Sequence, residues 1–68
     1  MTLKEFFELI RSDECISIYD VQENVYLFHE ICKGDYHGEY DNCIVARLTT
    51  NTTQFYYPVL EVEVCKGD

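Results

Sequence analysis

The stretch Leu60-Glu61-Val62-Glu63-Val64 alternates apolar and acidic side chains with a period of two. In an extended strand this alternation puts the apolar side chains on one face and the glutamates on the other. Such a strand belongs to a sheet that is buried on one side and solvated on the other. We therefore expect a strand within Phe55–Cys65 and a second layer over its apolar face. Pro58 indicates that the strand starts late or lies at a sheet edge.

Three further runs have the composition of strands and are separated by polar, turn-like segments. They are Glu14–Tyr19, Val25–Cys32 and Cys43–Thr49. The first places Ile16 and Ile18 on one face. Short connections between consecutive runs favour antiparallel neighbours, so the runs predict a four-stranded, mainly antiparallel sheet in up-and-down order.

The covering layer is expected at the N-terminus. Thr2 and Glu5 have the spacing of a capping box, which predicts a helix start. An apolar stripe follows at helical spacing: Leu3, Phe6, Phe7 and Ile10. A helix of about ten residues is unstable alone in water, so this one must pack on the sheet. The expected fold is α+β: one N-terminal helix on a four-stranded, mainly antiparallel sheet, with residues 1–68 as a single domain.

The tetrapeptide Cys-Lys-Gly-Asp occurs twice, at residues 32–35 and 65–68, each time after a strand-like run. A glycine two positions after a cysteine lets the backbone curl and point amide groups at the sulfur, as the surroundings of a metal-bound thiolate require. In an up-and-down sheet, the starts of the first and third strands lie beside the ends of the second and fourth. All four sulfurs then meet at one end and predict a tetrahedral Zn²⁺ site. Its ligands are Cys15, Cys32, Cys43 and Cys65, with His37 able to replace one sulfur, most readily Cys15.

Two other states of the cysteines remain open. Cysteine is also a small buried apolar residue, so the four thiols can be inert parts of the core. One or more disulfides are the third state, which a reducing cytosol disfavours. His29 lies within a strand and is expected to be a packed or surface residue and not a ligand.

Charge restricts the class of partner. The chain has 13 acidic and five basic residues, a formal net charge of −8. Such a chain repels phosphate and is suited to a basic protein surface. The loop Lys33–Asn42 interleaves acids with tyrosines, a composition suited to binding a basic partner. Its expected contact residues are Asp35, Tyr36, Glu39, Tyr40 and Asp41. The alternative is a solvated loop whose tyrosines pack down on the sheet.

Little in the sequence indicates catalysis. A Cys–His pair such as Cys32 with His37 could in principle form a nucleophile, but a substrate cavity is hard to build from so few residues. The sequence has no Ser-His-Asp or Gly-x-Ser-x-Gly pattern, no glycine-rich phosphate loop and only two histidines, so we expect no enzyme activity. The first residues lack the basic region of a signal peptide, and no apolar run reaches membrane-spanning length. We therefore expect a cytoplasmic protein.

Three segments resemble small acidic proteins carried by phages and mobile elements of Firmicutes: Met1–Ile10, Ile16–Asp20 and Leu60–Val64. That set includes anti-CRISPR inhibitors of type II-A Cas9, of which at least one kind carries zinc. The resemblance implies a non-enzymatic protein that acts in the bacterial host cytoplasm, binds Cas9 and blocks nucleic-acid loading or cleavage. The alternative is a small zinc-stabilised accessory or regulatory domain that binds another protein.

Overall fold

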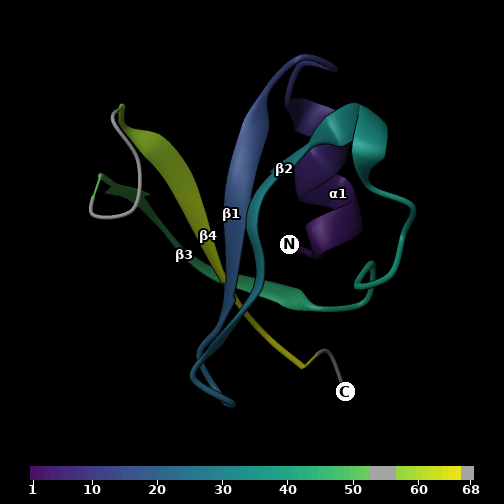
Figure 1. The fold of residues 1–68 in the computed structure, drawn as a ribbon. Coiled ribbons are helices and arrows are strands. Elements are labelled where there is room, and N and C mark those ends of the chain that lie inside the picture. The colour runs from purple at the N-terminus through teal and green to yellow at the C-terminus, as the bar shows by residue number, and fades with distance from the viewer. Residues whose placement is uncertain (53–56, 67–68) are drawn as a thin grey trace.

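The computed structural model describes residues 1–52 and 57–66. It contains one α-helix, one short 3₁₀ helix and four strands (Figure 1). In chain order they are α1 (Leu3–Leu9), β1 (Cys15–Asp20), β2 (Val25–Cys32), η1 (Lys33–Asp35), β3 (Ile44–Asn51) and β4 (Val59–Cys65). The predicted α+β fold, with an N-terminal helix on a mainly antiparallel four-stranded sheet, is confirmed. β4 begins directly after Pro58, so the late start suggested by the proline is also confirmed.

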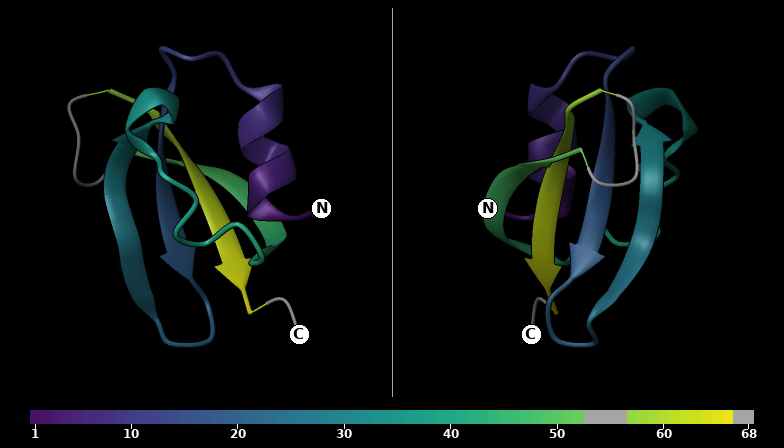
Figure 2. Two further views of the ribbon diagram at one scale, coloured as in Figure 1. Left: turned by 90° about the vertical axis from the view of Figure 1, so that its right-hand side faces the viewer. Right: turned by 60° about the vertical axis from the view of Figure 1, so that its left-hand side comes forward.

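The expected up-and-down strand order is wrong. The order across the sheet is β2-β1-β4-β3. β1–β2 and β3–β4 are antiparallel pairs, and β1 and β4 lie parallel in the centre. The segment between β2 and β3 makes this order possible, because it crosses from one edge of the sheet to the other on the side that carries α1 (Figure 2). Four short runs with turn-like connections do not reveal such a crossover.

The helix starts as predicted and ends earlier than expected. Thr2 Oγ1 accepts a hydrogen bond from the Glu5 backbone N–H at 3.2 Å, and the Thr2 N–H donates to Glu5 Oε1 at 2.9 Å. These hydrogen bonds from Thr2 lower the pKa of the Glu5 carboxyl. The helix ends at Leu9, and Ile10 has an extended backbone, with φ −93° and ψ 161°.

The residues that flank the start of α1 fasten it to β3. The Leu3 N–H donates to the Cys43 carbonyl at 2.8 Å, and the Val45 N–H donates to the Met1 carbonyl at 2.8 Å. Helix and sheet are thus joined by backbone hydrogen bonds as well as by apolar contact.

The core lies between α1 and one face of the sheet. Its buried members are Leu3, Phe6, Phe7, Ile16, Ile18, Ile31, Val62 and Val64. Ile16, Ile18, Val62 and Val64, which were predicted to point inward, are among them, and Leu60 is half-buried against this core, so the period-two pattern assigned the apolar face correctly. Figure 2 shows α1 on this face and no described helix on the other. We call the second surface the helix-free face.

Candidate functional site

The strand order separates the four cysteines into two pairs at opposite ends of the sheet. Cys15 begins β1 and lies opposite Cys32, which ends β2. Cys65 ends β4 and lies opposite Ile44, the neighbour of Cys43. Because β1 and β4 run parallel, the start of β1 and the end of β4 are at opposite ends. The convergence of four sulfurs expected from the up-and-down order is therefore wrong.

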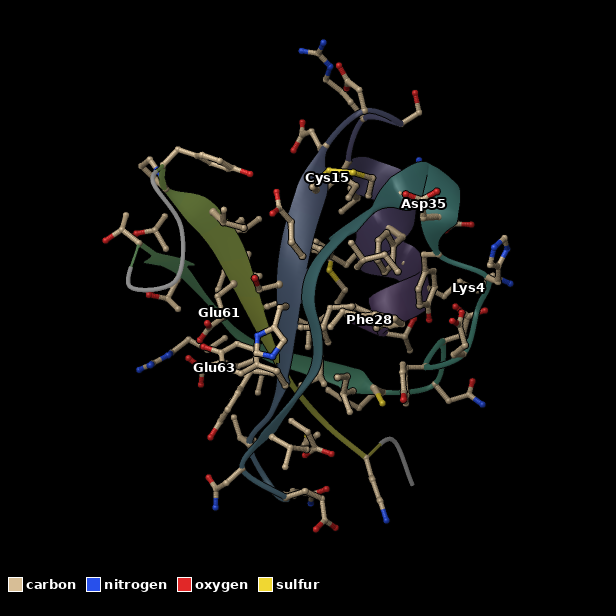
Figure 3. All side chains as sticks on the ribbon, in the orientation of Figure 1. Lys4, Cys15, Phe28, Asp35, Glu61 and Glu63 are labelled. Atoms are coloured by element: carbon tan, nitrogen blue, oxygen red, sulfur yellow. A yellow bond between two sulfur atoms is a disulfide. The ribbon has the colours of Figure 1, made fainter. Side chains whose placement is uncertain are left out.

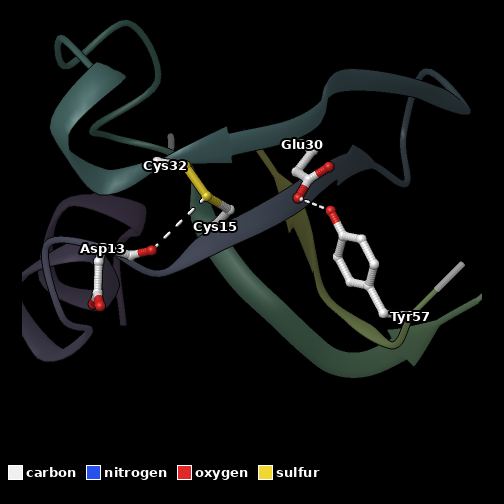
Figure 4. The surroundings of a disulfide bond; sticks show 5 residues. All are labelled: Asp13, Cys15, Glu30, Cys32 and Tyr57. Atoms are coloured by element: carbon white, nitrogen blue, oxygen red, sulfur yellow. Dashed lines mark hydrogen bonds between the residues drawn. A yellow bond between two sulfur atoms is a disulfide. The ribbon is translucent and has the colours of Figure 1, made fainter. Parts of the chain in front are cut away.

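The first pair is a disulfide between Cys15 and Cys32 (Figure 4). The expectation that disulfides are disfavoured is thus also corrected. Cys43 and Cys65 are free thiols. Burial raises the pKa of the Cys43 thiol, and the nearby Asp20 and Cys65 raise it further. Cys43 therefore remains protonated at neutral pH.

The described residues contain no group of three or more His, Cys, Asp or Glu side chains that could hold a metal ion. His37 is exposed, and its backbone N–H donates to Glu39 Oε1 at 2.8 Å. In the first Cys-Lys-Gly-Asp copy, Cys32 ends β2 and the other three residues form η1, where a Cβ at Gly34 would meet nothing within 4 Å. The fold at this position therefore does not demand glycine. The last two residues of the second copy lie outside the described residues.

The tyrosines of the loop Lys33–Asn42 pack inward. Tyr36 stacks on Phe7 with ring centroids 4.1 Å apart, and its hydroxyl donates to Asp41 Oδ1 at 2.9 Å. The same hydroxyl accepts the Tyr40 N–H at 2.9 Å. Burial is the main cause that raises the pKa of Tyr36 above its ordinary range.

Tyr40 packs edge-on against Phe28, with ring centroids 5.8 Å apart. Of the five expected contact residues, Tyr36, Tyr40 and Asp41 thus have structural roles inside the loop. Asp35 and Glu39 are exposed. The geometry fits the alternative in which the tyrosines pack down, while a role of the acids in binding stays a prediction.

A second set of tyrosines and acids lies on the helix-free face. The strand registers align four side chains in one row across the whole sheet. Tyr26 lies opposite Tyr19, Tyr19 lies beside Glu63, and Glu63 lies opposite Arg47. The Tyr19 and Tyr26 rings meet edge-on with centroids 4.9 Å apart. Arg47 donates from Nε at 3.1 Å and from Nη2 at 2.9 Å to the same carboxylate oxygen of Glu63.

The neighbouring row contains Ser17 of β1, Glu61 of β4 and Thr49 of β3. Ser17 is buried and donates to the His29 carbonyl. Tyr26 links the two rows, because its hydroxyl donates to Glu61 Oε1 at 2.6 Å.

β2 extends the helix-free face. The His29 ring stacks on Tyr26 with centroids 4.8 Å apart. Glu30 precedes the inward-facing Ile31, and its Oε1 accepts the Tyr57 hydroxyl at 2.7 Å (Figure 4). Figure 3 shows Phe28 on the helix side of the sheet and Glu61 and Glu63 on the opposite side.

Sequence reasoning missed this cluster. Alternation correctly placed Glu61 and Glu63 on the face away from the helix, but the expected solvation is wrong, because Glu61 is buried and the Glu63 side chain is only 15% exposed. Their aromatic neighbours come from β1 and β2, and that proximity depends on the parallel β1–β4 pairing. The signal available in the sequence was the alternation of Ser17 and Tyr19 with Ile16 and Ile18. It shows the face of each side chain but not its neighbour across the sheet.

The described helices include none that is both long and apolar enough to cross a membrane. Neither a protein-family model, nor a curated protein, nor a solved structure matches this chain.

Proposed function

We propose that this chain is a non-enzymatic inhibitor that binds a basic host defence protein. Type II-A Cas9 is the specific partner that the resemblance suggests. Binding would block nucleic-acid loading or cleavage in the cytoplasm of the bacterial host.

The distribution of charge is the observation that supports this function. Eight acidic side chains are exposed among the described residues: Glu5, Glu8, Asp13, Glu14, Glu23, Glu30, Asp35 and Glu39. The exposed basic side chains in the same part of the chain are Lys4, Arg11, Arg47 and Lys66. Two of these cations are already paired within the protein, Arg11 with Asp13 at 3.4 Å and Arg47 with Glu63 at 2.9 Å. Exposed acids outnumber exposed bases two to one among the described residues, so the outward field is negative.

A negative field of this kind speeds encounter with a positively charged surface. Cas9 holds its RNA–DNA duplex in a positively charged channel. A small acidic protein that occupies part of such a channel competes with nucleic acid for the same cations. This inhibition needs no reaction chemistry and no copy of the shape of DNA.

The test is cleavage of a DNA target by several type II-A Cas9 proteins with increasing amounts of this chain. We expect cleavage to fall with dose, and to fall less at higher salt because screening weakens the association. Addition before and after the guide RNA distinguishes blocked loading from blocked cleavage. Asp35→Asn/Glu39→Gln reports on the loop acids, and Glu5 is left intact because it caps the helix. Unchanged cleavage at large molar excess would favour the accessory-domain function instead.

A further inference from the structure

We propose that the helix-free face is the docking surface for an arginine-bearing segment of the basic partner. In the free protein, Arg47 occupies one guanidinium position on this surface. The inference rests on the proposed function in one respect, namely that the partner is basic. It adds the surface that is used and the side chain that is recognised.

The contact between Arg47 and Glu63 shows which kind of cation the helix-free face already holds. The Glu63 side chain is only 15% exposed, whereas the Arg47 side chain is 71% exposed. The carboxylate is thus recessed in the face, and the guanidinium lies over it from the edge strand β3. Two N–H groups of the same guanidinium reach one carboxylate oxygen. The face therefore already holds a planar, forked cation. Because the guanidinium half of this pair is open to water, an arginine from outside can compete with Arg47 for its place on Glu63.

The aromatic side chains beside Glu63 favour arginine over lysine. Tyr19 lies in the same row as Glu63, and Tyr26 lies next to Tyr19. A guanidinium stacks on aromatic rings while it donates to a carboxylate, and a lysine ammonium has no planar fork for this arrangement. A row that combines tyrosines with a recessed carboxylate therefore suits arginine better than lysine.

Charge complementarity decides the kind of occupant. Among the described side chains of this face, the Glu30 carboxylate is exposed, the Glu63 carboxylate is recessed, Glu61 is buried, and Arg47 contributes an exposed guanidinium. Nucleic acid and a second copy of this chain, which has a net charge of −8, are both repelled. A cationic protein segment is the occupant that the charges favour.

The experiment measures the affinity of the full chain for nona-arginine and nona-lysine peptides by calorimetry, with backbone amide NMR shifts to locate the contact. We expect tighter binding of nona-arginine and shifts concentrated in β1, β4 and the first half of β2. Shifts confined to residues 33–42 would overturn the proposal, and so would equal affinities for the two peptides.

Two variant pairs separate a specific surface from general acidity. Arg47→Ala removes the internal occupant and Arg11→Ala is its control, because both remove an exposed, paired arginine and change the charge equally. We expect Arg47→Ala to tighten nona-arginine binding about three- to fivefold and Arg11→Ala to change it by less than about twofold. Glu63→Gln should weaken binding more than Glu39→Gln, with thermal melts to confirm that each variant is folded. Equal effects within each pair would overturn the proposal.

Failure of the proposed function gives a different result. If Cas9 cleavage is unaffected but Arg47→Ala still tightens peptide binding, the partner is wrong and the surface stands. If Cas9 is inhibited equally by the wild type, Arg47→Ala and Glu63→Gln, the function stands and this surface is wrong.

Discussion

The loop Lys33–Asn42 and the helix-free face are built from the same residue types, tyrosines and acids, but only the loop lies on the side of the sheet that carries α1 (Figure 2). In the loop, Tyr36 stacks on Phe7 and its hydroxyl donates a hydrogen bond to Asp41, so both the ring and the hydroxyl make contacts within the protein. On the face, the Tyr19 and Tyr26 rings pack on each other and their hydroxyls donate to Asn24 and Glu61, but no described helix covers them. Composition alone therefore does not identify a contact surface. The position of α1 decides which set is turned inward.

The largest expected effect tests how firmly the loop side is fastened. Cys32 directly precedes η1 and the loop, and Cys32→Ser removes its disulfide to Cys15. We expect a loss of about 3 kcal/mol in the free energy of unfolding of the oxidised protein, from the cross-link across 17 positions. Cys65→Ser is the control and should cost less. Urea denaturation with and without reductant measures the loss in each variant. The difference in stability between the wild type and Cys32→Ser should vanish under reduction.

Counting thiols and zinc in the same preparation adds a second readout. Two titratable thiols in the folded, oxidised protein would agree with the disulfide. Four thiols, or one zinc ion per chain, would restore the four-sulfur hypothesis and contradict the separation of the two pairs.

The second effect tests the inward role of the loop. Tyr36→Ala removes a ring that contacts Phe7 and Phe28 and a hydroxyl with two hydrogen bonds. We expect unfolding to become easier by about 2 to 3 kcal/mol, as for other partly buried aromatic truncations. Tyr57→Ala is the control, because Tyr57 is 52% exposed, and it should cost less than about 1 kcal/mol. Similar losses in the two variants would remove the contrast between the regions.

A third effect follows from the raised pKa of Tyr36. The folded state holds the Tyr36 proton more tightly than the unfolded chain does. This stability is therefore fully present below the ordinary tyrosine pKa near 10 and is lost as pH rises through the folded value. Denaturation at pH 7 and at pH values above 10 should show the loss in the wild type. Tyr36→Phe should show a smaller loss, and an equal pH dependence in both proteins would contradict the assignment.

The smallest effects come from two glycines of the loop. Gly38 has φ +85°, and a Cβ there would lie 3.0 Å from Asp41 Oδ2. Gly38→Ala should therefore lower the free energy of unfolding by about 1 kcal/mol. Gly34→Ala should change it by less than about 0.5 kcal/mol, because Gly34 sits in open space. Thermal melts of the two single variants are sufficient, and a larger loss for Gly34 would contradict the loop geometry.

Local patterns predicted the elements of the fold. The order of the strands could not be predicted, because it depends on pairing between residues far apart in the sequence. The Thr2–Glu5 spacing predicted the helix start, and alternation predicted the inward faces of β1 and β4, because both signals act within a few residues. Strand order depends on the crossover between β2 and β3, for which the sequence has no local signal. The error in order carried directly into the site, because it brought four cysteines together and left Tyr19 apart from Glu63.

The parallel pairing of β1 with β4 also bears on how the chain folds. Each antiparallel pair is a two-stranded ribbon that is marginal alone, and the sheet is complete only when Ile16 meets Leu60, 44 positions further along. Closing so long a loop costs conformational entropy before the stabilising contacts form. This cost slows the folding of proteins whose contacts join distant parts of the sequence. We therefore expect docking of the two ribbons to limit the folding rate. Until then the apolar edges of β1 and β4 are open to pairing with other chains, so the slowest step is also the one most exposed to aggregation.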